Sequence, residues 1–268
     1  MRILSLHYPL PNAQIDNKDI FNAPSLFEYD AIIFHPLGFE QSILNWLKGD
    51  EEFYTASGEK VVQELSGNNA RNINEILTQR RNEIEQFLTM NGLLVTYAIP
   101  EMSIFAEQQH AVEIEGNLFS RLFSKIFPRP TLQNELDAHD DQFSTSRYAL
   151  FNLNQDVNFS ELIIPGSGFT NMTVNDLNYI DNQIFQNILH EHADKISYQG
   201  YFDNDTMNNI TTMQPLLLTA KSGIPIAASL EAINGQIVFL PNFIQGNTDE
   251  AMTEARLLVD DIVSIMNK

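Results

Sequence analysis

The sequence predicts an α/β fold built on a doubly wound, mostly parallel sheet, with helices on both faces, a C-terminal antiparallel hairpin and a helical insertion. Three observations lead to this prediction. An amphipathic helix over residues 72–91, within the unit 68–100, runs directly into the apolar strand LLVTYAI, and a helix followed by a buried strand is the half-unit of such a sheet. Short apolar runs typical of strands covered on both faces occur elsewhere in the chain. Near the end of the sequence, Asn234-Gly235 predicts a tight hairpin turn.

The first predicted strand covers residues 2–8, because Pro9 and Pro11 cannot donate to a sheet ladder. The segment YDAIIFHP, residues 29–36, predicts a second strand with a buried AIIF centre. A short helix is expected over residues 39–49, with its apolar residues facing inward: Ile43, Trp46 and Leu47.

The long helix places its apolar residues near the i, i+3, i+4 spacing of one helix face: Ile73, Ile76, Leu77, Ile84, Phe87 and Leu88. Gly92 follows the helix at the position where a left-handed conformation costs glycine no steric strain. The strand after it ends at Pro100. This unit is expected to lie at the centre of the sheet.

Residues 101–142 interrupt the alternation of strands and helices, and we expect them to form an insertion that contains an amphipathic helix over residues 117–127. The remaining patterns predict six strands and two helices. The strands are expected at 147–153, 161–166, 196–202, 215–221, 224–233 and 236–243, and the helices at 174–192 and 249–267.

Size and charge limit the function classes. A chain of 268 residues that is 43% apolar can bury a large core, so we expect a single α/β domain over residues 1–268 with 101–142 inserted. Fifteen Lys and Arg oppose 35 Asp and Glu, which gives a formal net charge of −20. This charge repels phosphate backbones and anionic membrane surfaces, so direct nucleic-acid and membrane binding are disfavoured. The acidity itself favours solubility, with a docking surface for a basic partner or mimicry of nucleic acid as the alternatives.

Targeting signals and cysteine are both missing from the sequence. The apolar-rich run before Pro9 has six residues and is too short for a secretory signal, and no apolar run approaches the roughly 18 residues of a membrane span. The chain has no cysteine and therefore no disulfides. A cytoplasmic location is expected.

Two segments carry a family resemblance. EIEQFLTMNGLLVTYAIP resembles the helix, glycine and apolar-strand unit of class I glutamine amidotransferase-like domains, and GIPIAASLEAINGQIVFLPNF is similar to the late hairpin that accompanies it. The resemblance covers about a third of the chain and implies a flavodoxin-like sheet. Catalytic members use a cysteine nucleophile on a strand-to-helix turn, and no residue here can supply that thiol. The resemblance therefore implies a degenerate branch whose scaffold serves binding or assembly.

Ligands of open α/β sheets bind beyond the carboxyl ends of the strands, which directs attention to the residues that follow each predicted strand. His35 and Glu101 lie at such positions and could act as a base and its orienting carboxylate. Ser167 lies in IIPGSGF, but the glycine spacing differs from the G-x-S-x-G of a nucleophile elbow. A loop histidine, a helix-opening glutamate and a tight turn are the ordinary explanations of these three residues.

Metal and cofactor motifs are weak. His190 and His192 are two residues apart at a predicted helix end and would point to different sides of a continuing helix. The run AHDD, residues 138–141, reads as a polar loop. The chain also lacks GK[ST] and G-x-G-x-x-G. We expect no metal site and no cofactor.

The predicted helix over residues 117–127 has a wide apolar stripe beside two basic residues. Such a helix either joins the core or docks a partner protein or a second copy of the chain. The residues that we expect to contact a partner are Leu118, Phe119, Arg121, Leu122, Phe123 and Lys125.

The sequence thus favours a non-catalytic binding or assembly subunit that acts with a protein partner in a bacterial multi-component system. The alternative is a cysteine-independent hydrolase or small-ligand enzyme that uses His35, Glu101 or Ser167 at the strand ends.

Overall fold

The computed structural model describes residues 1–47, 51–54, 60–64, 68–99, 104–109, 143–148, 152–153, 157–158, 162–171, 173–180, 184–232 and 234–267. The chain divides into two compact units. Unit 1 comprises Met1–Ser42, Ile76–Glu101 and Leu150–Lys268, and unit 2 comprises Ile43–Glu75 and Met102–Ala149.

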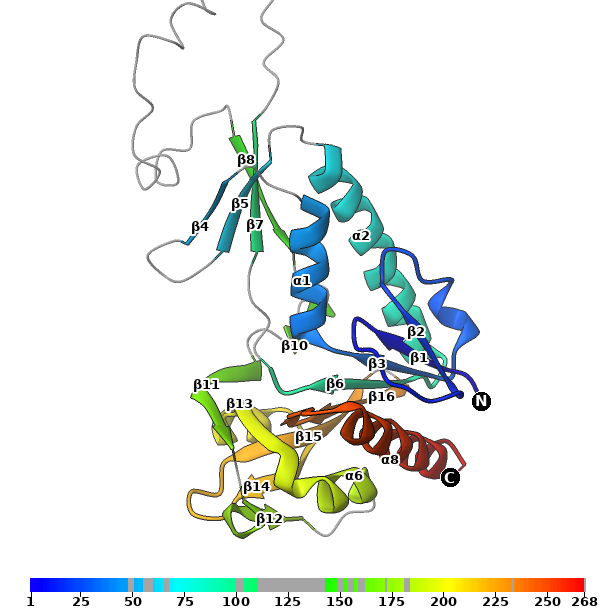
Figure 1. Ribbon diagram of the computed structural model, residues 1–268, viewed down its shortest axis with the longest axis vertical. Helices are drawn as coiled ribbons and strands as arrows, with labels where there is room; N and C mark the ends of the chain where they lie inside the picture. Colours follow the sequence, from blue (N-terminus) through cyan, green and yellow to red (C-terminus); the bar gives the residue numbers. More distant parts are fainter. Residues whose placement is uncertain are drawn as a thin grey trace, which may run out of the picture. The chain divides into compact units, whose positions relative to one another are not determined.

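Unit 1 is built on an eight-stranded sheet in the order β12-β14-β15-β16-β6-β3-β1-β2 (Figure 1). The five strands from β16 to β2 pair in parallel, whereas β12, β14 and β15 join antiparallel. The α/β class, the mostly parallel sheet and the late antiparallel hairpin are therefore confirmed. The strands are β1 (Ile3–Leu6), β2 (Ile15–Lys18), β3 (Ala31–Phe34), β6 (Leu93–Tyr97), β12 (Leu177–Tyr179), β14 (Met213–Thr219), β15 (Pro225–Ala232) and β16 (Gly235–Leu240).

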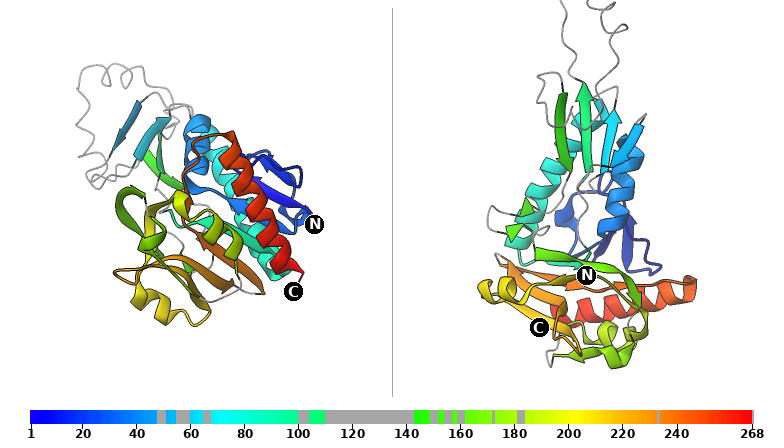
Figure 2. Two further views of the ribbon diagram at one scale, coloured as in Figure 1. Left: turned by 60° about the horizontal axis from the view of Figure 1, so that its bottom comes forward. Right: turned by 90° about the vertical axis from the view of Figure 1, so that its left-hand side faces the viewer.

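The central parallel strands are buried on both faces. Ile33 of β3 belongs to an apolar cluster with Leu258 of α8 (Thr248–Met266), whereas the alternate residues Ile32 and Phe34 face the other side and have no exposed surface. Figure 1 and Figure 2 show α8 on one face of this sheet and the C-terminal half of α2 (Asn68–Thr89) on the other. Burial on both faces explains the continuous apolar runs in the sequence.

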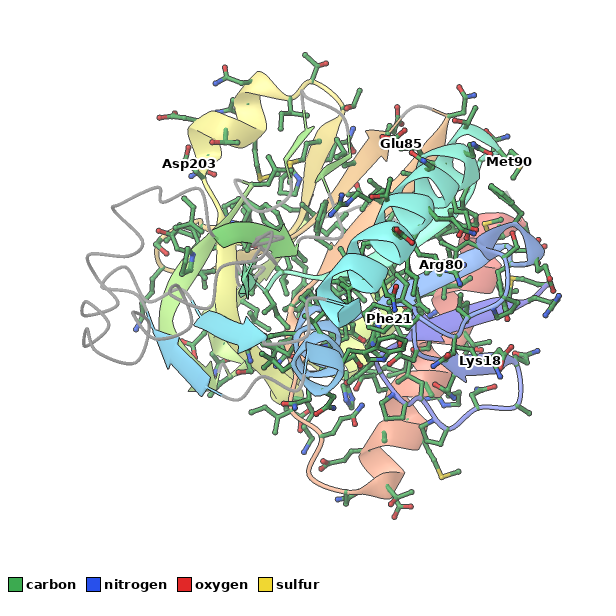
Figure 3. The ribbon with its side chains drawn as sticks, turned by 90° about the horizontal axis from the view of Figure 1, so that it is seen from above. Lys18, Phe21, Arg80, Glu85, Met90 and Asp203 are labelled. Carbon is green, nitrogen blue, oxygen red and sulfur yellow. The ribbon has the colours of Figure 1, made fainter. Side chains whose placement is uncertain are left out.

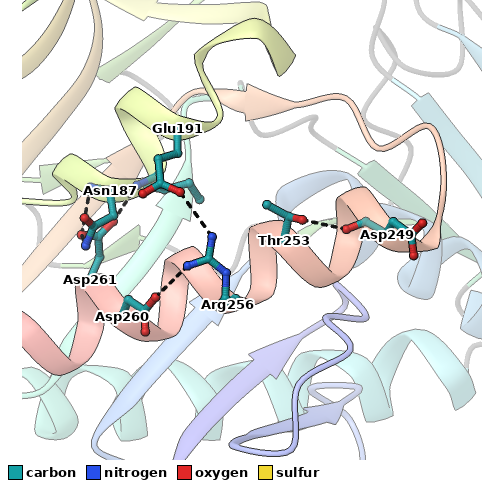
Figure 4. A network of polar contacts seen from close by, with 8 residues as sticks. Asn187, Glu191, Asp249, Thr253, Arg256, Asp260 and Asp261 are labelled. Carbon is teal, nitrogen blue, oxygen red and sulfur yellow. Dashed lines mark hydrogen bonds and ion pairs between the residues drawn. The ribbon is translucent and has the colours of Figure 1, made fainter.

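The short helix α6 (Gln186–Glu191) is fixed to α8 by a carboxylate. Asp261 of α8 accepts hydrogen bonds from the backbone N–H groups of Asn187 (3.2 Å) and Ile188 (2.9 Å), which lie in the first turn of α6 (Figure 4). Arg256 adds an exposed ion pair to Glu191 at 3.3 Å. A residue of one helix thus caps the N-terminus of the other.

A three-stranded antiparallel sheet, β11-β13-β17, also belongs to unit 1. Its strands are β11 (Ile163–Asn171), β13 (Ile196–Phe202) and β17 (Asn242–Phe243). The register of β11 against β13 breaks between Pro165 and Thr170. Smaller elements of this unit are α1 (Pro36–Leu47), whose first residues lie in unit 1, β9 (Asn152–Leu153), β10 (Val157–Asn158) and α7 (Asn204–Asn209).

Unit 2 contains a four-stranded sheet in the order β4-β5-β7-β8, in which β5 and β7 pair in parallel and the other neighbours antiparallel. The strands are β4 (Glu51–Tyr54), β5 (Lys60–Glu64), β7 (Ile104–Gln109) and β8 (Phe143–Tyr148). Strand β7 lies inside the range expected to form a helical insertion. The helix predicted over 117–127 lies outside the described residues.

Two local expectations need correction. In the range expected to form one helix, 174–192, residues 174–176 form a 3-10 turn and 177–179 form β12, and α6 covers only Gln186–Glu191. Leu177 and Ile188 satisfy a helical spacing while lying in separate elements. The turn expected at Asn234-Gly235 is displaced, because Gly235 already begins β16 and pairs with Ala232 of β15. A Cβ at Gly235 would come within 2.5 Å of the Gly92 carbonyl oxygen, so the close approach of two backbones explains this glycine.

Candidate functional site

Polar and aromatic side chains gather at the carboxyl ends of the parallel strands of unit 1. This is the edge at which open α/β sheets bind ligands. The group, here called the strand-end cluster, consists of Tyr8 after β1, His35 after β3, Tyr97 at the end of β6, Asn242 after β16, Gln245, and Glu254 on α8.

Glu254 is at the centre of the cluster and has no exposed surface. Its carboxylate accepts hydrogen bonds from the hydroxyls of Tyr8 at 3.0 Å and Tyr97 at 2.9 Å, and from Gln245 Nε2 at 2.8 Å. Burial raises the pKa of Glu254, while the hydrogen bonds from Gln245, Tyr97 and Tyr8 act in the opposite direction. The donors come from three separate parts of the chain, so this residue ties α8 to the strand ends.

The two tyrosines are held in their neutral forms. Burial is the main cause that raises the pKa of Tyr8 and of Tyr97, and the nearby Glu254 carboxylate raises both further. Gln245 Nε2 also donates to the Tyr8 hydroxyl at 2.6 Å. The tyrosines therefore serve as hydrogen-bond donors to Glu254.

His35 lies against the same tyrosines. Its ring stacks on Tyr8 with centroids 4.5 Å apart and tilts against Tyr97 at 4.7 Å. Burial lowers the pKa of His35 to about 4, although a hydrogen bond of 3.2 Å from Nε2 to Asn242 Oδ1 opposes this shift. The imidazole is therefore neutral near pH 7.

A second histidine with a buried side chain, His7, follows β1 in a left-handed conformation with φ 61°. Its Nε2 accepts from the Ile20 backbone N–H at 3.2 Å, so Nδ1 carries the proton and donates to Ser42 Oγ at 2.9 Å. Ser42 in turn donates to Asp19 at 2.9 Å. This order is the reverse of serine activation, in which the histidine accepts the hydroxyl proton. The group joins β1, the loop after β2 and α1.

A shallow pocket of about 540 Å³ lies beside the cluster. Gln245 lines it while bonding to Tyr8 and Glu254. Asn17, which also lines the pocket, bonds twice to the Leu10 backbone and holds the connection between β1 and β2 in place. The full lining is Pro9, Leu10, Pro11, Asn17, Gln245, Gly246, Asn247, Thr248 and Ala251.

The structure places only part of the predicted site. His35 belongs to the strand-end cluster. The backbone of Ser167 lies in β11, and its side chain is outside the described residues, as is all of Glu101. The predicted partner-binding residues also lie outside them: Leu118, Phe119, Arg121, Leu122, Phe123 and Lys125. The alternative site that uses His35, Glu101 or Ser167 therefore stays a prediction.

Sequence reasoning missed Tyr8, Tyr97, Gln245 and Glu254. One signal was present, because Glu254 lies three residues before Leu257 on the apolar face of the closing helix. A charged residue on such a face is buried, and burying a charge is costly unless a hydrogen-bond partner lies beside it. The identity of that partner depends on contacts between residues 8, 97 and 254, which are distant in the sequence.

Metal-binding groups, membrane-spanning helices and similarity to known proteins all bear on function. Within the described ranges, no three His, Asp or Glu side chains are grouped so that they could hold a metal ion. No helix in the described part of the chain is long and apolar enough to cross a membrane. Comparisons of the chain with protein-family models and with curated proteins give no match.

Proposed function

We propose that this protein is a cytoplasmic, non-catalytic binding or assembly subunit on a doubly wound, glutamine amidotransferase-like scaffold. It acts with a protein partner in a bacterial multi-component system. The observation that supports this proposal best is the strand-end cluster. Side chains of the protein itself occupy the edge where such a scaffold would hold a substrate, and Glu254 at its centre has no exposed surface.

The bonding within the cluster argues against its use in acid–base chemistry. A general base must reach the proton that it removes. His35 Nε2 is engaged by Asn242, and one face of the ring is stacked on Tyr8. Both oxygens of Glu254 accept hydrogen bonds from the protein's own groups. A substrate would have to displace these contacts before it reached the Glu254 carboxylate or His35 Nε2.

The first experiment compares catalysis with assembly. Purified protein incubated with L-glutamine is expected to release no ammonia above a buffer blank. Tagged protein isolated from its own host at near-physiological salt is expected to give a defined complex in native mass spectrometry. Glutamine hydrolysis that is lost in a His35→Gln variant would overturn the proposal.

A pair of variants tests the predicted docking stripe. Phe123→Asp should release the partner, because it places a charge in the apolar stripe of residues 118–127. Phe27→Asp is the matched control, since Phe27 is already 40% exposed. Retention of the partner by Phe123→Asp would remove the stripe from the proposal.

The alternative is a small-ligand enzyme, and the pocket lined by Gln245 is the observation in its favour. A ligand bound there would touch a side chain that bonds directly to Tyr8 and Glu254. Native mass spectrometry distinguishes the two functions, because a lone chain carrying a small-molecule mass would favour this alternative.

A further inference from the structure

A second pocket of unit 1 lies at the amino ends of β6 and β16, the edge of the sheet opposite to the strand-end cluster. We call it the amino-edge pocket. Its volume is about 500 Å³, within the range of about 300–1,000 Å³ that ligand sites occupy. Its walls come from the turn between α2 and β6, the turn between β15 and β16, and the end of α8.

The pocket lies on the face of the sheet that packs against α8. Leu93 of β6 pairs with Gln236 of β16, and Gln236 pairs with Glu231 of β15. Residues paired in this way project from the same face of a sheet. Leu93 belongs to the apolar cluster that includes Leu258 of α8, so Gln236 and Glu231 project from the α8 face as well.

The helix ends make this pocket electronegative. Helices α2 and α8 both end at its walls, and the C-terminal end of a helix carries a partial negative charge. Basic residues often offset this charge, but the last turn of neither helix contains one. Glu231 adds a full negative charge. It is exposed, and no ion pair joins it to a basic side chain within the part of the chain that the structure describes.

An amide oxygen and apolar side chains complete the walls. The Asn234 amide nitrogen donates to the Thr89 carbonyl at 3.0 Å, which fixes the amide and leaves its Oδ1 as an acceptor. Met266 lines the pocket and is 37% exposed, and Ile265 beside it packs partly against the core. The pocket thus combines a carboxylate, a neutral acceptor and an accessible apolar surface.

We propose that the amino-edge pocket binds an arginine side chain presented by the partner protein, an inference that rests on the proposed assembly function. A guanidinium has five N–H donors in a planar fork that matches a carboxylate, and no acceptor. Glu231 accepts from this fork, Asn234 Oδ1 takes a further donor, and the methylene stem lies against Met266. A lysine offers three donors from one nitrogen and cannot form the fork. An anion would be repelled by Glu231 and by both helix ends.

An NMR titration with N-acetyl-L-arginine amide in 0.15 M NaCl tests the pocket directly. All proteins carry Lys268→Ser, so that the basic residue two positions after Met266 cannot compete with the probe. We expect the backbone amide signals of Gly92 and Gly235 to shift with a Kd of about 1 mM, as for a ligand of this size. The citrulline analogue keeps the shape without the charge and should bind about tenfold more weakly.

Glu231→Gln and Asp249→Asn form a matched pair, because each removes one negative charge from an exposed residue of unit 1. Asp249 lies in the first turn of α8, about 25 Å from Met266 along the helix. This separation exceeds the Debye length of about 8 Å at 0.15 M salt. We expect Glu231→Gln to raise the Kd about fivefold and Asp249→Asn to change it by less than about twofold.

Three results of the titration would overturn the proposal. Equal effects of Glu231→Gln and Asp249→Asn would show a general attraction of cations to an acidic protein. Equal binding of the lysine or citrulline analogue would show that the guanidinium is not recognised. The third is a linear shift that does not saturate.

The complex isolated from the host separates this inference from the proposed function. Glu231→Arg should release the partner, because it places a positive charge in the pocket, whereas Asp249→Arg should retain it. A complex that survives Glu231→Arg would overturn the arginine pocket and leave the assembly function standing. Arginine binding in the titration without any complex would overturn the assembly function and leave the pocket as an arginine site.

Discussion

At the scale of single residues, the stability of unit 1 depends on a carboxylate with no access to water. Glu254→Ala removes the acceptor for the hydroxyls of Tyr8 and Tyr97 and for the amide of Gln245. Since Tyr97 is fully buried, its hydroxyl would have no water to replace the lost partner. We expect the free energy of unfolding to fall by about 3 kcal/mol, measured by urea denaturation.

Glu254→Gln is the control for this prediction, because it keeps one acceptor oxygen and the shape of the side chain. We expect it to cost about 1 kcal/mol. If Glu254→Ala unfolded at the same urea concentration as the unmodified protein, the cluster would not hold α8 to the strand ends.

His35 should make stability dependent on pH. Its pKa falls from 6.5 to about 4 on folding, so the unfolded state binds a proton more readily than the folded state. The stabilisation is therefore complete above pH 6.5 and is lost as the pH falls toward 4. The full loss is about 3 kcal/mol. Between pH 7 and pH 4, the free energy of unfolding of the unmodified protein should fall by about 3 kcal/mol more than that of His35→Gln. Urea denaturation across that pH range measures both. If the free energy of unfolding changed equally with pH in the two proteins, burial would not lower the pKa of His35.

At the scale of secondary-structure elements, Arg80 fixes the segment after β2 to helix α2. It is 7% exposed, donates to the carbonyls of Ile20 and Pro24 at 3.0 Å and to that of Ala23, and pairs with Glu83 at 2.7 Å. Figure 3 shows Arg80 on α2 facing the segment that carries Phe21.

Arg80→Ala leaves the Glu83 carboxylate and three backbone carbonyls without this donor. We expect a loss of about 3 kcal/mol in the free energy of unfolding, together with faster amide hydrogen exchange around residues 20–26. Arg256→Ala is the control, because its ion pairs lie on the surface of α8 and should contribute about 0.5 kcal/mol. Similar losses from the two variants would mean that the burial of Arg80 adds nothing.

The elements also show where sequence patterns succeed. Strands β3 and β6 were predictable because both of their faces are buried and their sequences are continuously apolar. Strand β2, with the sequence IDNK, was not predicted, because it is an edge strand that buries only Ile15. His35 was predictable because it follows a strand, whereas Glu254 was not, since its partners are set by the packing of α8.

At the scale of the whole molecule, the division into two units could not be predicted from local patterns. The sheet of unit 2 depends on β5 pairing with β7, which joins Lys60 to Ile104 across the whole of α2 and β6. Periodicity reports the structure of a segment but not its distant partner. The order of the eight strands in unit 1 depends in the same way on contacts far apart in the sequence.

The net charge of −20 should make the protein sensitive to salt. At this charge, repulsion among carboxylates destabilises the compact state, and salt screens it. The Debye length falls from about 30 Å at 0.01 M to about 8 Å at 0.15 M. We expect the Tm to rise by about 2–4 °C over this range, which corresponds to about 1 kcal/mol.

Surface ion pairs such as Arg2 with Glu28 act in the opposite direction, because salt weakens them. Each contributes little, because both side chains are about half exposed. A scan of Tm against NaCl concentration decides which effect is larger, and a Tm that fell with added salt would show that attractive pairs outweigh the repulsion.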